Sequence, residues 1–236
     1  MKKFRFMKAA LLLLALLAVS YFLSCDGDDP FTPIGDEPGD WVDITESSGL
    51  VNTSSPFAYE GSALGPNLYK AVGWTVNDEA AVNGNVSVTR GSALGMIAFT
   101  SVPSPSIING KLYQTIELEA GSYKLDVIVF NNASTSNTPF SAYIVVVEGN
   151  DLPDTYADAA HRPQSDVASE TIACLSIPRI GTTSTNTGNT PLQNVSVEFN
   201  LTEAKTVSLG FAATFYSTAI INFQSFYNKV ELFKAE

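Results

Sequence analysis

Apolar and polar residues alternate with a period of two over most of the chain after residue 40. In residues 111–119 one face is formed by Leu112, Gln114, Ile116 and Leu118, and the other by Lys111, Thr115, Glu117 and Glu119. This period is typical of strands that bury one face. After a turn at Ala120-Gly121 the alternation resumes through Val129, so residues 111–130 predict a β-hairpin.

Further strands are predicted at residues 69–76, 86–89, 96–99, 142–147, 195–201, 207–211 and 219–233. The run 142–147 is continuously apolar, which indicates a strand covered on both faces. The last run changes phase near Asn228, which indicates a β-bulge. Helical patterning is nearly absent, and only residues 153–160 could form a turn or two. Many short strands joined by polar turns predict an all-β fold, a two-sheet antiparallel β-sandwich or jelly roll.

The start of the chain follows a different pattern. Lys2, Lys3, Arg5 and Lys8 precede the apolar run 9–19, which breaks at Ser20 and is shorter than the roughly 20 residues that a membrane-spanning helix needs. Such a segment is typical of a secretory signal peptide. The ending Leu23-Ser24-Cys25 resembles the lipobox of bacterial lipoproteins, although Phe22 stands where that motif prefers an aliphatic residue. We expect residues 1–24 to be removed and Cys25 to be lipidated; the alternative is an ordinary signal peptide with an incidental cysteine.

Residues 25–40 combine acidic residues, glycine and proline without apolar periodicity, which predicts an extended acidic linker. The sequence Asp26-Gly27-Asp28-Asp29 resembles the acidic tag that directs Bacteroidetes lipoproteins to the outer face of the outer membrane. In enterobacteria an aspartate at this place argues for inner-membrane retention instead. We expect a lipid-anchored protein of the outer membrane that faces the cell exterior, with one β-sandwich domain over residues 41–236.

Charge and cysteine content narrow the possible partners. Loss of residues 1–24 leaves nine Lys and Arg residues against 24 acidic ones, a net charge of −15. Such a surface repels phosphate, so nucleic acid is not an expected partner. Because Cys25 would be acylated, Cys174 has no partner for an internal disulfide, and its apolar neighbours predict a buried thiol.

The residue types that most catalytic sites require are scarce. A serine or cysteine nucleophile normally needs a histidine, and His161 is the only one in the sequence. One histidine and one available cysteine cannot build a zinc site. Two carboxylates can cleave a glycan, but Glu117 and Glu119 lie on a strand face expected to be solvated. We predict no catalytic residue, no metal ligand and no cofactor. Asn77, Asp78 and Glu79 form an acidic turn but not an Asp-x-Asp-x-Asp-Gly calcium loop, and a structural calcium ion elsewhere in the sandwich stays open.

The long polar loops are predicted to gather at one end of the sandwich. Consecutive antiparallel strands place alternate connections at opposite ends, so loops 100–110, 131–140, 178–192 and 214–219 should lie opposite the turn at 119–122. The predicted ligand-binding residues there are Asn131, Asn132, Asn137, Arg179, Asn186, Asn189, Phe215 and Tyr216. Amides and arginine bind sugar hydroxyls, and an aromatic ring stacks on a pyranose. The alternative is that asparagine is simply common in loops and that Phe215 fills the core.

Two tryptophans are expected to be structural. Trp74 follows Gly73 at the start of a strand and should be a core residue, and Trp41 should close the end of the sandwich near the linker. Neither is predicted to be a sugar platform.

Three segments resemble a known family: Gly73-Trp74-Thr75-Val76, the run LYQTIELEAGSYKLDV over residues 112–127, and the closing strand 223–233. They are similar to the galactose-binding-like jelly rolls at the C-termini of Bacteroidetes surface lipoproteins encoded with glycan-uptake machinery. The resemblance covers about residues 43–236. It implies a glycan ligand, and outer-membrane glycan-uptake proteins as partners.

Three functions are compatible with these patterns. The first is a surface-tethered, non-catalytic carbohydrate-binding lipoprotein that captures glycan for uptake or degradation partners. The second is a structural adhesin or fimbria-like subunit that exchanges strands with its neighbours. The third, a polysaccharide-active enzyme, has the least support because no nucleophile constellation is present.

Overall fold

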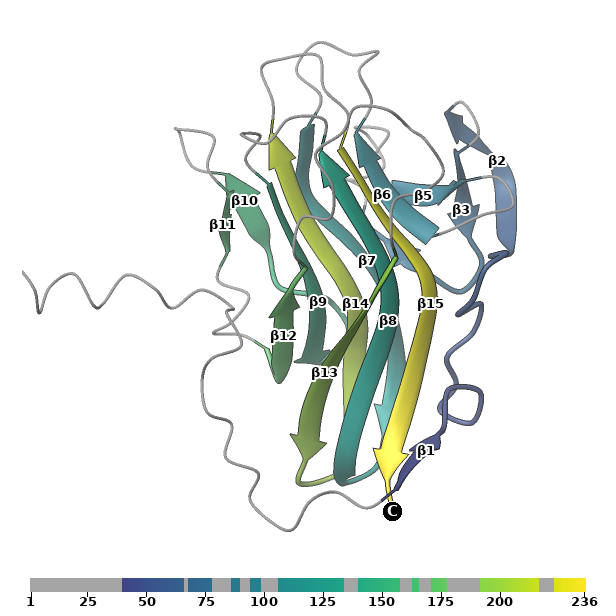
Figure 1. Ribbon diagram of the computed structural model, residues 1–236, viewed down its shortest axis with the longest axis vertical. Helices are drawn as coiled ribbons and strands as arrows, with labels where there is room; N and C mark the ends of the chain where they lie inside the picture. The colour runs from purple at the N-terminus through teal and green to yellow at the C-terminus, as the bar shows by residue number, and fades with distance from the viewer. Residues whose placement is uncertain are drawn as a thin grey trace, which may run out of the picture.

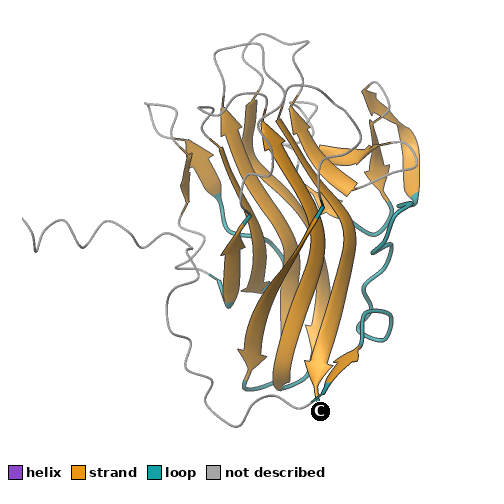
Figure 2. Cartoon of the chain, in the orientation of Figure 1, coloured by secondary structure: helices purple, strands orange, loops and turns teal. Residues whose placement is uncertain are grey.

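The computed structural model describes residues 40–65, 68–77, 86–89, 94–98, 106–133, 140–157, 163–165, 171–177, 192–216 and 223–236. These residues form fifteen strands joined by loops and turns (Figure 2). The described residues contain no helix, and therefore none with the length and apolarity to cross a membrane.

The strands form two main sheets, and all pairs are antiparallel (Figure 1). The larger has eight strands: β13 (Gln193–Leu201), β8 (Gly121–Ala133), β15 (Phe223–Ala235), β6 (Leu94–Ala98), β5 (Val86–Thr89), β3 (Leu68–Ala71) and β2 (Tyr59–Gly65) in that order, with β1 (Trp41–Asp43) also paired to β15. The smaller has five, in the order β12 (Ala173–Ser176), β9 (Phe140–Glu148), β14 (Lys205–Tyr216), β7 (Ser106–Leu118) and β4 (Thr75–Val76). A separate pair is formed by β10 (Thr155–Ala157) and β11 (Pro163–Ser165).

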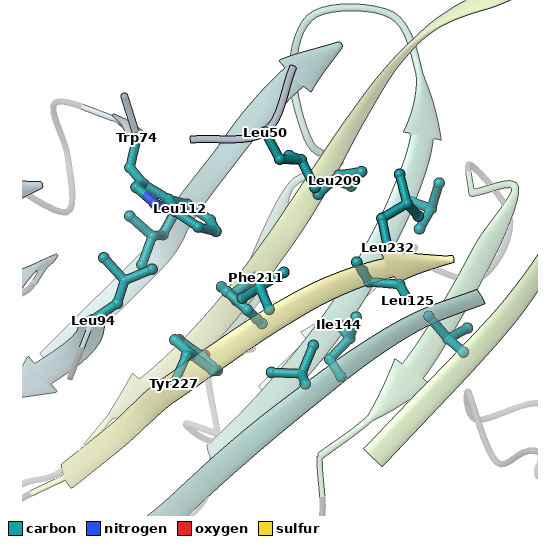
Figure 3. Packing of buried hydrophobic residues seen from close by; sticks show 14 of the residues in the cluster. Leu50, Trp74, Leu94, Leu112, Leu125, Ile144, Leu209, Phe211, Tyr227 and Leu232 are labelled. Carbon is teal, nitrogen blue, oxygen red and sulfur yellow. The ribbon is translucent and has the colours of Figure 1, made fainter. Parts of the chain in front are cut away.

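The two main sheets pack face to face, which confirms the predicted all-β sandwich. The chain changes between the two main sheets after β3, β4, β6, β7, β8, β12, β13 and β14, as it does in a jelly roll. Inward-facing side chains of both sheets meet in one apolar cluster (Figure 3). Within it, Phe211 of β14 stacks on Tyr227 of β15, with ring centroids 3.4 Å apart, and on Trp74 at 5.9 Å. Trp74 is 2% exposed, so its predicted place in the core is confirmed.

The predicted hairpin over residues 111–130 is wrong. Strands β7 and β8 do follow one another around the turn at residues 119–120, but β7 pairs with β14 and β4, whereas β8 pairs with β13 and β15. The turn therefore joins the two sheets as an arch, and Leu112 and Leu125 reach the core from opposite sides (Figure 3). A hydrogen bond closes the arch: the Tyr123 hydroxyl donates to the backbone carbonyl of Glu119 at 2.7 Å.

Two other strand predictions need correction. The run 69–76 is broken after Ala71, because Gly73 adopts a φ of 77° and the chain then crosses to the other sheet as β4. Residues 155–157 form strand β10, where a helical turn was considered. By contrast, the bulge near Asn228 is confirmed, since the pairing of β15 with β8 shifts register between Tyr227 and Lys229.

Strand β9 is covered on both faces, as its apolar run predicts. Ile144 and Val146 face the main core, while Val145 and Val147 belong to a second, smaller cluster on the outer face of the five-stranded sheet. Leu152 closes this second cluster from the segment that follows β9. The thiol of Cys174 packs against it and is half-buried, less covered than predicted.

Candidate functional site

The ends of several strands meet at one end of the sandwich. Strand β8 ends at Ala133, β14 ends at Tyr216, and β15 begins at Phe223. Their registers agree: Ala133 lies opposite Phe223, and Tyr216 lies opposite Ser106, the first residue of β7. Strand β9 also begins here, because Phe140 pairs with Phe215. We call this end, formed by residues 106, 133, 140, 216 and 223, the loop end; it is at the top of Figure 1.

The structure places half of the predicted ligand-binding residues at this end. Asn131 and Asn132 lie close to the end of β8, opposite Ser225 and Gln224 of β15, respectively. Phe215 and Tyr216 are the last two residues of β14, in the other sheet. The backbone of the sandwich thus brings two asparagines and two aromatic residues to one end from two sheets.

The other predicted positions are Asn137, Arg179, Asn186 and Asn189, and they lie outside the described residues, as does Cys25. Strand β12 ends at Ser176, opposite Tyr143 near the start of β9, and β13 begins at Gln193, opposite Val129. The chain therefore leaves β12 and enters β13 on the side of the loop end. The ligand roles of all eight residues stay predictions.

The outer face of the five-stranded sheet carries a polar centre that sequence reasoning missed. Lys111 was expected on a solvated face, but its side chain is only 6% exposed. Its ammonium group lies 2.7 Å from Asp154 and 3.1 Å from Asp151, both in the segment that covers this face. The apolar run of β9 predicts a cover on this face, but β14 lies between β9 and β7, so the run does not show that the cover extends to Lys111.

Asparagine side chains complete this polar centre. Asn109, at a φ of 56°, donates to Asp154 at 2.9 Å and accepts from the backbone N–H of Thr155 at 2.9 Å. Asn77 accepts from the backbone N–H of Lys111 at 3.1 Å. The hydroxyl of Thr214 donates to that of Thr155 at 2.6 Å, two residues before the end of β14. This network fixes β10 against β7 and β14 close to the loop end.

The charged groups of this centre shift one another's pKa values in the direction that keeps them charged. Burial lowers the pKa of Lys111, but hydrogen bonds to Asp154 and Asp151 more than offset this, so the pKa is raised above its usual value. The hydrogen bond from Lys111, with that from Asn109, lowers the pKa of Asp154. Burial, with the nearby charge of Asp151, raises the pKa of the Tyr113 phenol. The centre therefore holds a lysine cation paired with two carboxylates.

Candidate catalytic and metal sites are few in the part of the chain that the structure describes. Glu117 and Glu119 are exposed, as predicted, and Glu117 accepts a hydrogen bond from Thr206. No group of three or more His, Cys, Asp or Glu side chains converges within these residues. Asn77 is bonded to the backbone of β7, while Asp78 and Glu79 lie outside the described residues.

Comparison with known proteins gives one family match. No curated protein matches the chain. Among solved structures, the carbohydrate recognition domain of Emp47p is 11% identical, with a TM-score of 0.41, and the match covers 86% of this chain and all of that one. TmCBM61, solved in complex with beta-1,4-galactotriose, is 14% identical, with a TM-score of 0.33, and the match covers 80% of this chain and 93% of that one. Neither likeness assigns a ligand to this chain.

The family match assigns the chain to a protein family. The model described as "Domain of unknown function (DUF5013)" matches residues 52–210. It ends within β14, whereas β15, which lies between β8 and β6 in the eight-stranded sheet, follows it. The folded unit thus extends beyond the matched segment. Because the match covers more than half of the chain, the protein belongs to the DUF5013 family.

Proposed function

We propose that this chain is a non-catalytic carbohydrate-binding lipoprotein. It is held at the outer membrane by lipidated Cys25 and captures glycan for uptake or degradation partners. The observation that carries the proposal is the loop end, where strands of two sheets bring Asn131, Asn132, Phe215 and Tyr216 to one end of the sandwich. Loops and strand ends on a rigid scaffold are the usual place for binding residues.

The residue types at the loop end fit a sugar better than a charged ligand. Amide groups both donate and accept hydrogen bonds, so they match hydroxyl groups that do the same. Aromatic rings present a negative face that attracts the CH groups of a pyranose. These four side chains are uncharged, and a net charge of −15 on the processed chain disfavours polyanionic ligands.

The linker joins the domain far from this surface. Trp41 in β1 pairs with Ala235 at the end of β15, and β15 starts at the loop end with Phe223. Thirteen residues of strand at a rise of about 3.3 Å place the two ends roughly 40 Å apart. A domain tethered through residues 25–40 would therefore hold its loop end away from the membrane, where external glycan is found.

Calorimetric titration of residues 26–236 with soluble polysaccharides tests the binding function. We expect micromolar to millimolar affinity for at least one glycan, weakened tenfold or more by Asn132→Ala or Tyr216→Ala. Asn200→Ala, near the opposite end of β13, is the matched control and should bind normally. Equal affinity of all three variants and the wild type would show that the ligand does not use the loop end.

Membrane attachment needs a separate test. The full chain should incorporate a palmitate analogue in bacterial cells and fractionate with the outer membrane, and Cys25→Ser should abolish both. An unlabelled wild-type chain would overturn the anchor while leaving the glycan function open.

A further inference from the structure

Strand β7 contains an extra residue close to the loop end. The pairing of β14 with β7 joins Ala213 to Gly110 but Phe215 to Ile107, so two steps along β14 correspond to three along β7. Asn109 lies in this β-bulge and adopts a φ of 56°, a left-handed conformation that asparagine tolerates better than most residues. Bulges are over-represented next to active sites, where they redirect side chains. This one lies beside the last residues of β14.

The bulge changes which residues of β7 face the core. On one side of it Leu112, Ile116 and Leu118 take the core face, all in even-numbered positions. On the other side Ile107 takes that face, is 0% exposed and belongs to the same apolar cluster. Because the side chains of a strand alternate with a period of two, a regular β7 would place Ile107 on the outer face. The bulge therefore sets the register at the loop end.

Three polar side chains hold the bulge. Thr214 of β14 lies opposite it, and the Thr214 hydroxyl donates to that of Thr155 in β10 at 2.6 Å. Thr214 and Thr155 are 0% and 1% exposed. Asn109 accepts from the backbone N–H of Thr155 and donates to Asp154, both at 2.9 Å. We call Asn109, Thr155 and Thr214 the bulge cluster.

Stability alone does not account for the bulge cluster. Two buried hydroxyl groups that bond to each other both give up their bonds to water, so the net gain in free energy is small. Apolar groups of similar shape at both positions can be nearly as stable. What a fully satisfied buried network adds is a single arrangement of the strands that it joins. The bulge cluster therefore fixes β10 and the bulge relative to the end of β14.

The strand end that the bulge cluster holds carries two of the predicted ligand-binding residues. Phe215 and Tyr216 directly follow Thr214 and are the last residues of β14. Figure 1 shows β10 and β11 beside this end of β14. Binding groups must be held within about 0.5 Å of their productive positions by the residues around them. A small displacement of this strand end would therefore weaken binding although no ligand contact is removed.

We propose that the bulge cluster positions the end of β14 for glycan binding: it holds Phe215 and Tyr216 in place without touching the ligand itself. The inference rests on the proposed carbohydrate-binding function. Thr214 is the central positioning residue, because it belongs to the strand that carries both aromatic residues and is bonded to β10.

Affinity electrophoresis through gels containing galactan, arabinan or xyloglucan tests this role. The wild-type chain from residue 26 onward should be retarded by at least one of these neutral polysaccharides. Thr214→Val keeps the shape of the side chain and removes the hydroxyl, and it should reduce the apparent affinity about fivefold or more. Thr214→Ser keeps the hydroxyl and should restore most of the affinity.

Ser208→Ala is the matched control. Ser208 is 0% exposed, and its hydroxyl bonds to that of Thr115 at 2.8 Å across the same two strands, but farther from the loop end. Ser208→Ala should therefore lower stability in urea denaturation, as Thr214→Val does, and yet be retarded like the wild type.

The outcomes separate this inference from the proposed function. Retardation of Thr214→Val like the wild type, no recovery in Thr214→Ser, or equal weakening in Ser208→Ala each overturns the positioning role and leaves the proposed function standing. No retardation of a folded wild-type chain in any gel defeats the proposed function and, with it, this inference. Should Thr214→Val not fold, Asn109→Gly decides, because glycine keeps the positive φ and removes both side-chain bonds. It must weaken binding as well, and wild-type affinity in this variant refutes the positioning role.

Discussion

Lys111 shows how a single residue departs from a sequence pattern. It alternates with the core residues of β7, which correctly places it on the outer face of the sheet. Periodicity, however, does not reveal what covers that face. The cover comes from Asp151, Leu152 and Asp154, some 40 residues later, so the burial of Lys111 depends on a contact between distant parts of the chain.

The polar centre predicts that removing its negative charges and removing its positive charge affect stability to different extents. Asp151 and Asp154 are 63% and 71% exposed, whereas Lys111 is buried. Removing the aspartates leaves a buried charge unpaired, while removing the lysine leaves two carboxylates that water can reach. We expect Asp151→Asn with Asp154→Asn to lower the free energy of unfolding by about 2–3 kcal/mol, discounted for solvent screening. We expect Lys111→Met to lower it by less than about 1 kcal/mol. Urea denaturation measures both, and an equal loss would contradict this account.

The same centre predicts a dependence on pH. The pKa of Asp154 is lower in the folded chain than its usual value, so its contribution to stability is present above about pH 4 and is lost as the pH falls through the folded pKa. The wild-type chain should therefore exceed Asp154→Asn in melting temperature at pH 6, and the difference should shrink between pH 4 and pH 2. A difference that stays constant over this range would exclude the ion pair as its source.

The arch formed by β7 and β8 shows the limit of pattern reading for whole elements. The sequence predicts both strands and the turn between them, because apolar residues alternate with polar ones on each side of Ala120. It does not predict their partners, because an alternating strand buries the same face whether it pairs with its neighbour or faces it across a core. The split of the run 69–76 had a local signal, Gly73, since glycine readily adopts the positive φ found there.

A hydrogen bond at this arch provides a test of its closure. Tyr123 is 1% exposed and donates to the backbone carbonyl of Glu119, so Tyr123→Phe should lower the free energy of unfolding by about 1 kcal/mol. Glu119→Ala keeps the carbonyl acceptor and should leave stability nearly unchanged. Thermal and urea unfolding compare the two variants, and a larger loss in Glu119→Ala would show that the backbone bond is not what closes the arch.

At the scale of the whole molecule, the loop end and the start of the domain lie at opposite ends of β15. The sequence predicts that the polar loops gather, because this follows from strand count alone. The sequence does not predict where the loop-end residues lie relative to one another, because this depends on how segments pack, which the alternation does not describe.

The lengthwise arrangement predicts an orientation on a membrane. With the lipidated chain on vesicles, a fluorophore at Thr202, next to the turn between β13 and β14, should be quenched by a lipid-linked quencher more strongly than one at Ala133, at the loop end. The reason is that Leu201 pairs with Gly121 at the end of the sandwich that receives the linker, while Ala133 pairs with Phe223 at the other. Equal quenching at both positions would contradict the outward display of the loop end.

Binding of the folded domain to carbohydrate is the claim on which the rest depends, and a glycan array probed with residues 26–236 tests it most directly. We predict specific signals from one class of neutral glycan, reduced by Asn132→Ala and Tyr216→Ala but not by Asn200→Ala. A sample that unfolds cooperatively, and is therefore native, yet binds no glycan on the array would contradict the account.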